Sequence, residues 1–125
     1  MGLDQQLAIR NGEDYEPIAY FRKVNFLHGW AERELNDGAE TNCDYLPISG
    51  EQLNLLRRQC EAVLADPSKA GDLLATQGGF FFGSTEYGEY YLADVKDVLT
   101  ACERALQIIV EHGESPVEIC YWSWW

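Results

Sequence analysis

The sequence lacks long apolar runs, it has few histidines, and no two of its cysteines stand at C-x-x-C spacing. No apolar stretch approaches the roughly 18 residues that a membrane-spanning helix needs. The amino terminus lacks the basic flank and apolar segment of a secretory signal. The two histidines and four widely spaced cysteines show no zinc-ligand spacing and no disulfide framework. We therefore expect a protein of a reducing compartment, with no metal and no cofactor.

Basic residues are also scarce. The chain carries 21 acidic and nine basic residues, for a formal net charge of −12. Nucleic acids and anionic lipids are recognised by clustered Lys and Arg, so this composition argues against both as partners. An acidic surface suits a basic protein partner, or it serves solubility alone. The charge leaves these two interpretations open.

What is present is the composition of one folded domain. Apolar residues make up 46% of the 125 positions and charged residues 24%, close to the average for globular proteins. We expect a single domain over residues 1–125. The patterns predict strands at 3–10, 80–82 and 117–121 and helices at 18–34, 49–65 and 87–112, with a loop over 39–48. Ser49 and Gln52 form a capping-box pattern at the start of the second helix. This order predicts an α+β fold, in which a small antiparallel sheet that includes the terminal strands packs against about three helices.

Residues 20–30 are the segment densest in polar side chains. On a helix, Arg22, Asn25 and His28 follow one another at three-residue spacing and form one stripe. With Lys23 and Trp30 nearby, such a stripe is able to hold an anion or a nucleobase. His28 is also a candidate general base. The alternative is an ordinary solvated helix face.

Residues 78–85 combine glycines with hydroxyl side chains just before a predicted helix. Free N–H groups at a helix start favour anions, so Ser84 and Thr85, with Tyr87, are candidates to complete a ligand pocket. The segment lacks both the P-loop and the dinucleotide-binding spacing. The alternative is a buried strand followed by an ordinary helix cap.

Aromatic residues gather toward the end of the sequence. Tyr90, Trp122, Trp124 and Trp125 are candidate interface residues, because tyrosine and tryptophan are rigid and amphipathic. They would otherwise pack into the chain's own core or into a homodimer. No catalytic triad and no metal motif is present, so no catalytic residue is assigned.

Three segments together carry a resemblance. They are Met1-Gly2-Leu3-Asp4, the run from Tyr20 to Asn25 with Leu27-His28-Gly29-Trp30, and the run from Gly79 to Tyr87. In this order they resemble a family of small proteins encoded by bacteriophages and prophages, over nearly the whole chain. The resemblance implies a location in the cytoplasm of a bacterial host cell. It also implies a host factor, such as a component of a defence system, as the partner.

These observations support three hypotheses of function. The first is a phage-encoded, non-enzymatic inhibitor of the anti-CRISPR kind that binds a basic surface of a host defence protein. The second is a small-ligand binder that sequesters a nucleotide immune signal through the residues named above. The third is a small enzyme that uses His28 as its base.

Overall fold

The computed structural model describes residues 2–79, 82–115 and 117–125 and has two layers, a sheet and a set of helices. The sheet contains β1 (Asp4–Asn11), β2 (Asp14–Arg22), β3 (Tyr45–Ile48) and β4 (Glu118–Trp124). Its strand order is β2-β1-β4-β3, and all neighbours are antiparallel. The first and last strands of the chain are therefore the two central strands. This confirms the predicted α+β fold with the terminal strands in one antiparallel sheet.

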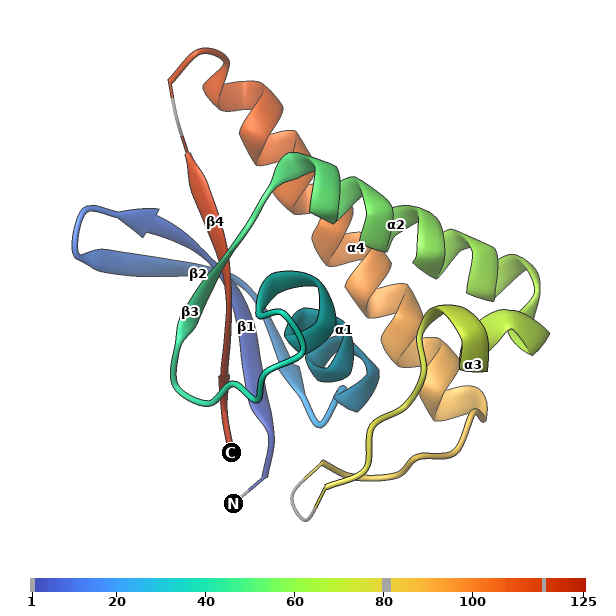
Figure 1. Ribbon diagram of the computed structural model, residues 1–125. Coiled ribbons are helices and arrows are strands. Elements are labelled where there is room, and N and C mark those ends of the chain that lie inside the picture. The colour runs from blue at the N-terminus through green and yellow to red at the C-terminus, as the bar shows by residue number, and fades with distance from the viewer. Residues whose placement is uncertain (1, 80–81, 116) are drawn as a thin grey trace.

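The helices lie on one face of this sheet (Figure 1). They are α1 (Asn25–Leu35), α2 (Gly50–Ala65), the short α3 (Ala70–Leu73) and α4 (Glu89–His112), with a 3-10 turn at Pro67–Lys69. The helix-facing side chains of β1 and β4 include Leu7, Ile9 and Ile119, and they join the apolar faces of the helices in one buried cluster. The opposite face of the sheet is covered by none of these helices. We call it the outer face.

The start of α2 follows the sequence prediction. Ser49 accepts a hydrogen bond from the Gln52 backbone N–H (3.1 Å), and the Gln52 side chain accepts one from the Ser49 backbone N–H (2.9 Å). Both bonds of the predicted capping box are thus formed.

The predicted helix over residues 18–34 is wrong in its first half. Residues 14–22 form β2, and Lys23 then adopts a left-handed backbone conformation (φ 56°) that ends the strand. The Gln5 amide holds the next residue, because it accepts a hydrogen bond from Val24 N (2.9 Å) and donates one to Val24 O (3.0 Å). Helix α1 consequently begins at Asn25.

Two other expectations changed. The segment predicted as a loop over 39–48 contains the short edge strand β3. The strand predicted over 80–82 falls largely outside the described residues, since residues 80 and 81 are not among them, and Phe82 lies in no strand. Strand β2 forms the other edge of the sheet. Pro17, which has no backbone N–H, is tolerated there because an edge strand leaves some of its backbone groups unpaired.

Candidate functional site

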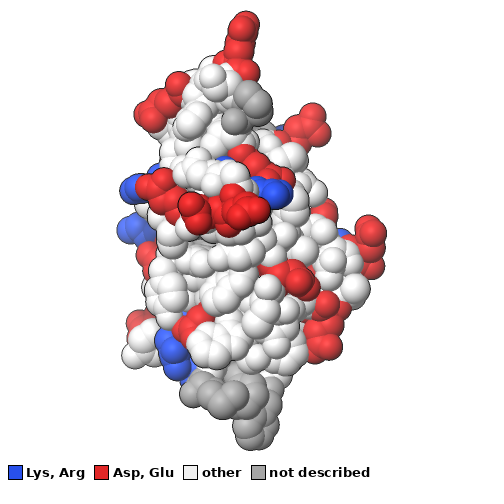
Figure 2. Space-filling model, turned by 90° about the vertical axis from the view of Figure 1, so that its left-hand side faces the viewer, with Lys and Arg blue, Asp and Glu red and all other residues white. Residues whose placement is uncertain are grey.

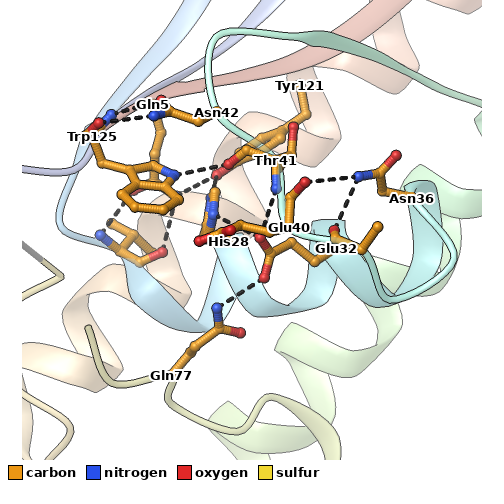
Figure 3. Close-up of polar contacts among 12 residues, drawn as sticks. Gln5, His28, Glu32, Asn36, Glu40, Thr41, Asn42, Gln77, Tyr121 and Trp125 are labelled. Atoms are coloured by element: carbon orange, nitrogen blue, oxygen red, sulfur yellow. Dashed lines mark hydrogen bonds and ion pairs between the residues drawn. The ribbon is translucent and has the colours of Figure 1, made fainter. Parts of the chain in front are cut away.

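Helix α1 carries a buried histidine that contacts the sheet on one side and a carboxylate on the other (Figure 3). The His28 side chain is 0% exposed. Its Nδ1 lies 2.8 Å from the Tyr121 hydroxyl of β4, and its Nε2 lies 3.2 Å from the Glu32 carboxylate, one helical turn further on. His28 therefore connects the central strand β4 to Glu32.

The hydrogen-bond network assigns the protons in this group. Gln5 donates to the Tyr121 hydroxyl (2.9 Å), which leaves the tyrosine proton to be donated to His28 Nδ1. The ring proton then resides on Nε2 and faces Glu32. Burial lowers the pKa of His28 despite the opposing effect of Glu32, so the imidazole is neutral at neutral pH. Although Nε2 lies 3.2 Å from the Glu32 carboxylate, the contact does not have the geometry of a hydrogen bond, and Nε2 has no hydrogen-bond partner among the residues that the structure describes.

Two loops fix the Glu32 carboxylate. The backbone N–H of Thr41 donates to one oxygen (2.8 Å), and the Gln77 side chain donates to the other (2.9 Å). Gly29 is required for this approach, because a Cβ at that position would lie 2.6 Å from the Gln77 amide oxygen. The close packing of Gln77 thus explains why a glycine occurs within helix α1.

Glu32 forms part of a pocket of about 310 Å³, which we call the acidic pocket. It lies between the two loops that hold the carboxylate, and its lining combines carboxylates, aromatic rings and glycine backbone. The lining residues are Glu32, Gly38, Glu40, Gln77, Gly78, Gly79, Phe82 and Trp125. The His28 ring lies behind it, with ring centroids 5.0 Å from Phe82 and 6.1 Å from Trp125. No lysine or arginine occurs among these lining residues, and the two charged side chains of the lining are both acidic.

A second pocket, of about 340 Å³, brings together several residues singled out from the sequence. Arg22, Lys23, Asn25 and Ser84 all line it, at the start of α1 and near the start of α4. Glu86 and Asp94 line it as well, and Arg22 forms an ion pair with Asp4 (3.0 Å). We call it the mixed-charge pocket. Since its two basic and two acidic side chains balance, its charge does not select a phosphate group.

Asn25 has a structural task within the mixed-charge pocket. Its amide nitrogen donates to the carbonyls of Phe82 (3.0 Å) and Ser84 (2.7 Å), and its oxygen accepts from the backbone N–H of Gln77 (3.1 Å). The side chain is thereby fully engaged in holding the loop between α3 and α4. This loop contributes to both pockets.

The other predicted ligand residues, Trp30, Thr85 and Tyr87, line neither pocket. Trp30 is 1% exposed in the core and donates its indole N–H to Gln59 (2.9 Å). The Thr85 carbonyl and the Tyr87 hydroxyl each accept a hydrogen bond from Thr76, at 3.0 and 3.1 Å. His28 lines neither pocket directly. The four predicted interface residues also divide: Tyr90 and Trp124 are exposed, whereas Trp122 and Trp125 are half-buried.

The raised pKa of Asp94 in the mixed-charge pocket predicts a pH-dependent change in stability. Burial, followed by the nearby Asp97, raises the pKa of Asp94 from 3.8 to about 6. The native state thus binds this proton more tightly than the unfolded state, and the stability gained below pH 3.8 is lost as pH rises through about 6. Asp94→Asn is therefore expected to be more stable than the wild type above that pH, by about 1–2 kcal/mol after allowance for partial solvent screening.

Urea unfolding at a series of pH values measures this difference. The gain should shrink as the pH falls below about 6 and disappear at about pH 3, below the unfolded-state value of 3.8, where Asp94 is protonated in both states. Asp72→Asn supplies the control for the substitution itself, because Asp72 is exposed on α3 and lies outside the mixed-charge pocket. A gain for Asp94→Asn that is the same at every pH would contradict the assignment.

Comparisons with known proteins found no relative of this chain. The chain matches no known family model, and no curated protein or solved structure is significantly similar to it. Across residues 2–79, 82–115 and 117–125, no helix has the length and apolar character to cross a membrane. The same residues contain no group of three side chains placed to hold a metal ion.

Sequence reasoning missed the residues around the acidic pocket. A histidine and a glutamate four residues apart on a helix lie on one face, so the pairing of His28 with Glu32 was visible in the sequence. The contributions of Gln5, Gln77 and Tyr121 were not, because they come from distant parts of the chain.

Proposed function

We propose that this protein is a non-enzymatic binding protein that docks on a basic surface of another protein. The observation that carries the proposal is the outer face of the sheet, which exposes the aromatic rings of Tyr20 and Trp124. Figure 2 shows the charged groups on this side of the molecule. Most of the surface in this view is uncharged, and most of the charged groups on it are acidic. Aromatic anchors surrounded by charge of one sign are typical of protein interfaces with a partner of opposite charge.

Strand register places one polar and three aromatic side chains in a row across all four strands. Tyr20 is opposite Gln6, Gln6 is opposite Trp122, and Trp122 is opposite Tyr45. Because Tyr121 faces the helices, the alternation along β4 directs Trp122 and this row to the outer face. Trp124 follows two residues later on the same face. Tyr20 is 63% exposed and Trp124 56% exposed.

Other contacts stiffen this surface. Tyr15 of β2 stacks on Tyr45 of β3 with ring centroids 3.5 Å apart, and Tyr45 lies 6.1 Å from Trp122. We call these five residues the aromatic face: Tyr15, Tyr20, Tyr45, Trp122 and Trp124. Stacked rings lose little conformational freedom when they bind, which favours affinity.

The charges beside the aromatic face are acidic in excess. Exposed acids occur at Glu13, Asp14 and Glu16 in the β1–β2 hairpin and at Asp44 before β3. Arg10 and Arg22 are each paired with a carboxylate, of Glu118 and Asp4. With a net charge of −12, the protein would attract a basic partner over a long range.

The resemblance to bacteriophage proteins extends this proposal to a bacterial host factor, and specifically to inhibition of a defence component. The sequestering of a nucleotide signal remains a prediction for the mixed-charge pocket. The burial of His28 argues against the use of this residue as a catalytic base, because no atom of its side chain is accessible to a substrate in this conformation.

The test is capture of partners from bacterial lysate, followed by measured binding of the purified partner. The double variant Tyr20→Ser/Trp124→Ser removes the two most exposed rings of the aromatic face. We expect a basic protein to be captured, at least about tenfold weaker binding by the double variant, and an association rate that falls with salt. Val110→Ser is the matched control, since Val110 is 72% exposed on α4 and lies outside the aromatic face.

Equal binding by the wild type and the double variant would contradict the proposal, as would a partner that is not basic. Sedimentation of the protein alone is a second readout. A dimer that the double variant abolishes would assign the aromatic face to a second copy of the chain and would also overturn the proposal.

A further inference from the structure

The acidic pocket lies apart from the aromatic face and has a chemistry of its own. It offers two carboxylates, Glu32 and Glu40, and two aromatic rings, Phe82 and Trp125, around a space of about 310 Å³. This volume is at the lower end of the range for small-molecule sites, which fits one side chain better than a whole nucleotide.

We propose that the acidic pocket receives the guanidinium group of an arginine side chain from the basic partner. This inference rests on the proposed function, because it names the group of the partner that the pocket would recognise.

The carboxylates supply the charge complement. Glu32 is held in place by the Thr41 N–H and the Gln77 amide, so it presents a fixed anionic group. Glu40 lies on the loop after α1 and is exposed, so it is free to turn toward a ligand. Carboxylates and guanidinium form two parallel hydrogen bonds, which is the strongest common form of ion pair in proteins.

The aromatic rings favour arginine over lysine. Phe82 and Trp125 meet edge to face, with centroids 5.2 Å apart and planes at 89°. The Trp125 indole is fixed by its hydrogen bond to the Thr41 carbonyl (2.8 Å). A planar guanidinium stacks on such a ring and is weakly hydrated, whereas an ammonium is compact and strongly hydrated.

The buried histidine behind the pocket has a ring nitrogen that the described residues around it leave without a hydrogen bond. Nδ1 of His28 is directed at Tyr121 in the sheet, so Nε2, on the other side of the ring, is directed at the carboxylate of Glu32 that lines the pocket. The side chain is 0% exposed, and Nε2 lacks a hydrogen-bond partner within the described part of the chain. Buried polar atoms without partners are uncommon in folded proteins and call for an explanation.

The same network keeps the pocket negative. Because burial lowers the pKa of His28, the ring is neutral at neutral pH and does not cancel the charge of Glu32. The Gln5–Tyr121–His28 chain of hydrogen bonds positions the ring without bringing a cation to the pocket. His28 therefore adds no positive charge to the pocket.

The experiment is an NMR titration of the whole protein with N-acetyl-arginine amide, a probe that carries the proposed group alone. The amide signals of Gly78 and Gly79 and the indole N–H of Trp125 report on the pocket. We expect saturable shifts with a dissociation constant on the order of 1 mM, as suits a single side chain. N-acetyl-citrulline amide, a neutral analogue of similar shape, should produce no saturable shift.

Glu40→Gln removes one pocket charge from an exposed loop position, where the fold does not depend on it. It should weaken binding of the arginine probe about threefold to tenfold. Glu34→Gln, at an exposed position of α1 outside the pocket, is the matched control and should bind as the wild type does.

Three results would overturn the inference: equal shifts with the citrulline analogue, equal binding of N-acetyl-lysine amide, or unchanged affinity in Glu40→Gln. The Tyr20→Ser/Trp124→Ser variant should bind the arginine probe normally. Failure of the acidic pocket and failure of the aromatic face would thus appear in different experiments.

Discussion

Trp30→Ala is expected to lower the free energy of unfolding by about 3–5 kcal/mol, because it removes the largest fully buried side chain of the described core. The indole is 1% exposed, and its N–H donates to Gln59 at the surface of α2. Small domains have a total stability of about 5–15 kcal/mol, so much of it would be lost. Urea unfolding followed by circular dichroism measures the change.

Trp124→Ala is the matched control for this prediction. Trp124 is 56% exposed at the end of β4, so its removal should cost less than about 1 kcal/mol. If the two tryptophan variants were equally stable, Trp30 would not be part of the core as described. In that case, unfolding would not account for any loss of ligand or partner binding by Trp30→Ala.

Asn25→Ala should have the second largest effect, a loss of about 2–4 kcal/mol. The substitution deletes three hydrogen bonds of a side chain in a residue that is 4% exposed. Each such bond contributes about 0.5–1.5 kcal/mol, and the groups left without partners add to the cost. The loop between α3 and α4 would lose its attachment to α1, so limited proteolysis should cleave it faster.

The same variant should also lose binding of the arginine probe, because Gln77 and the glycines after it line the acidic pocket. Asn54→Ala is the control, since the Asn54 side chain accepts hydrogen bonds from its neighbour Arg57 within α2, and its cost should stay within about 0.5 kcal/mol. Unchanged proteolysis of the loop in Asn25→Ala would show that the three bonds do not hold it.

The elements that the sequence predicted well are those with local signals. The capping box of Ser49 and Gln52 marks the start of α2, and the alternation of Val117, Ile119 and Tyr121 marks β4. Both patterns are complete within a few residues. The α+β class followed from the order of these elements.

The elements that it predicted poorly depend on distant partners. The apolar residues from Ile18 to Leu27 recur at a spacing that suits a helix, and only pairing with β1 makes the first part a strand. β3 has four residues and contains Pro47, so it shows little pattern of its own, and it forms because β4 offers a free edge. Strand pairing with remote segments overrides local preference in both cases.

The candidate sites show the same division. Arg22, Lys23, Asn25 and Ser84 were singled out together, and they do line one pocket. The sequence did not indicate that Glu86 and Asp94 would balance their charge there. His28 was singled out as a ligand-binding residue and a candidate general base, but the sheet residue Tyr121 and the loops around Glu32 enclose it.

The central position of β4 has a consequence for synthesis on the ribosome. The β1–β2 hairpin is local and able to pair early, but β1 has no second neighbour until residues 118–124 have been made. The bond between Gln5 and Tyr121 joins residues 116 positions apart, a separation typical of slowly folding chains. At roughly 5–20 residues per second, the nascent chain spends several seconds with an open edge on β1 and an uncovered apolar face. We expect this open edge to be a site of aggregation or chaperone binding until β4 is added.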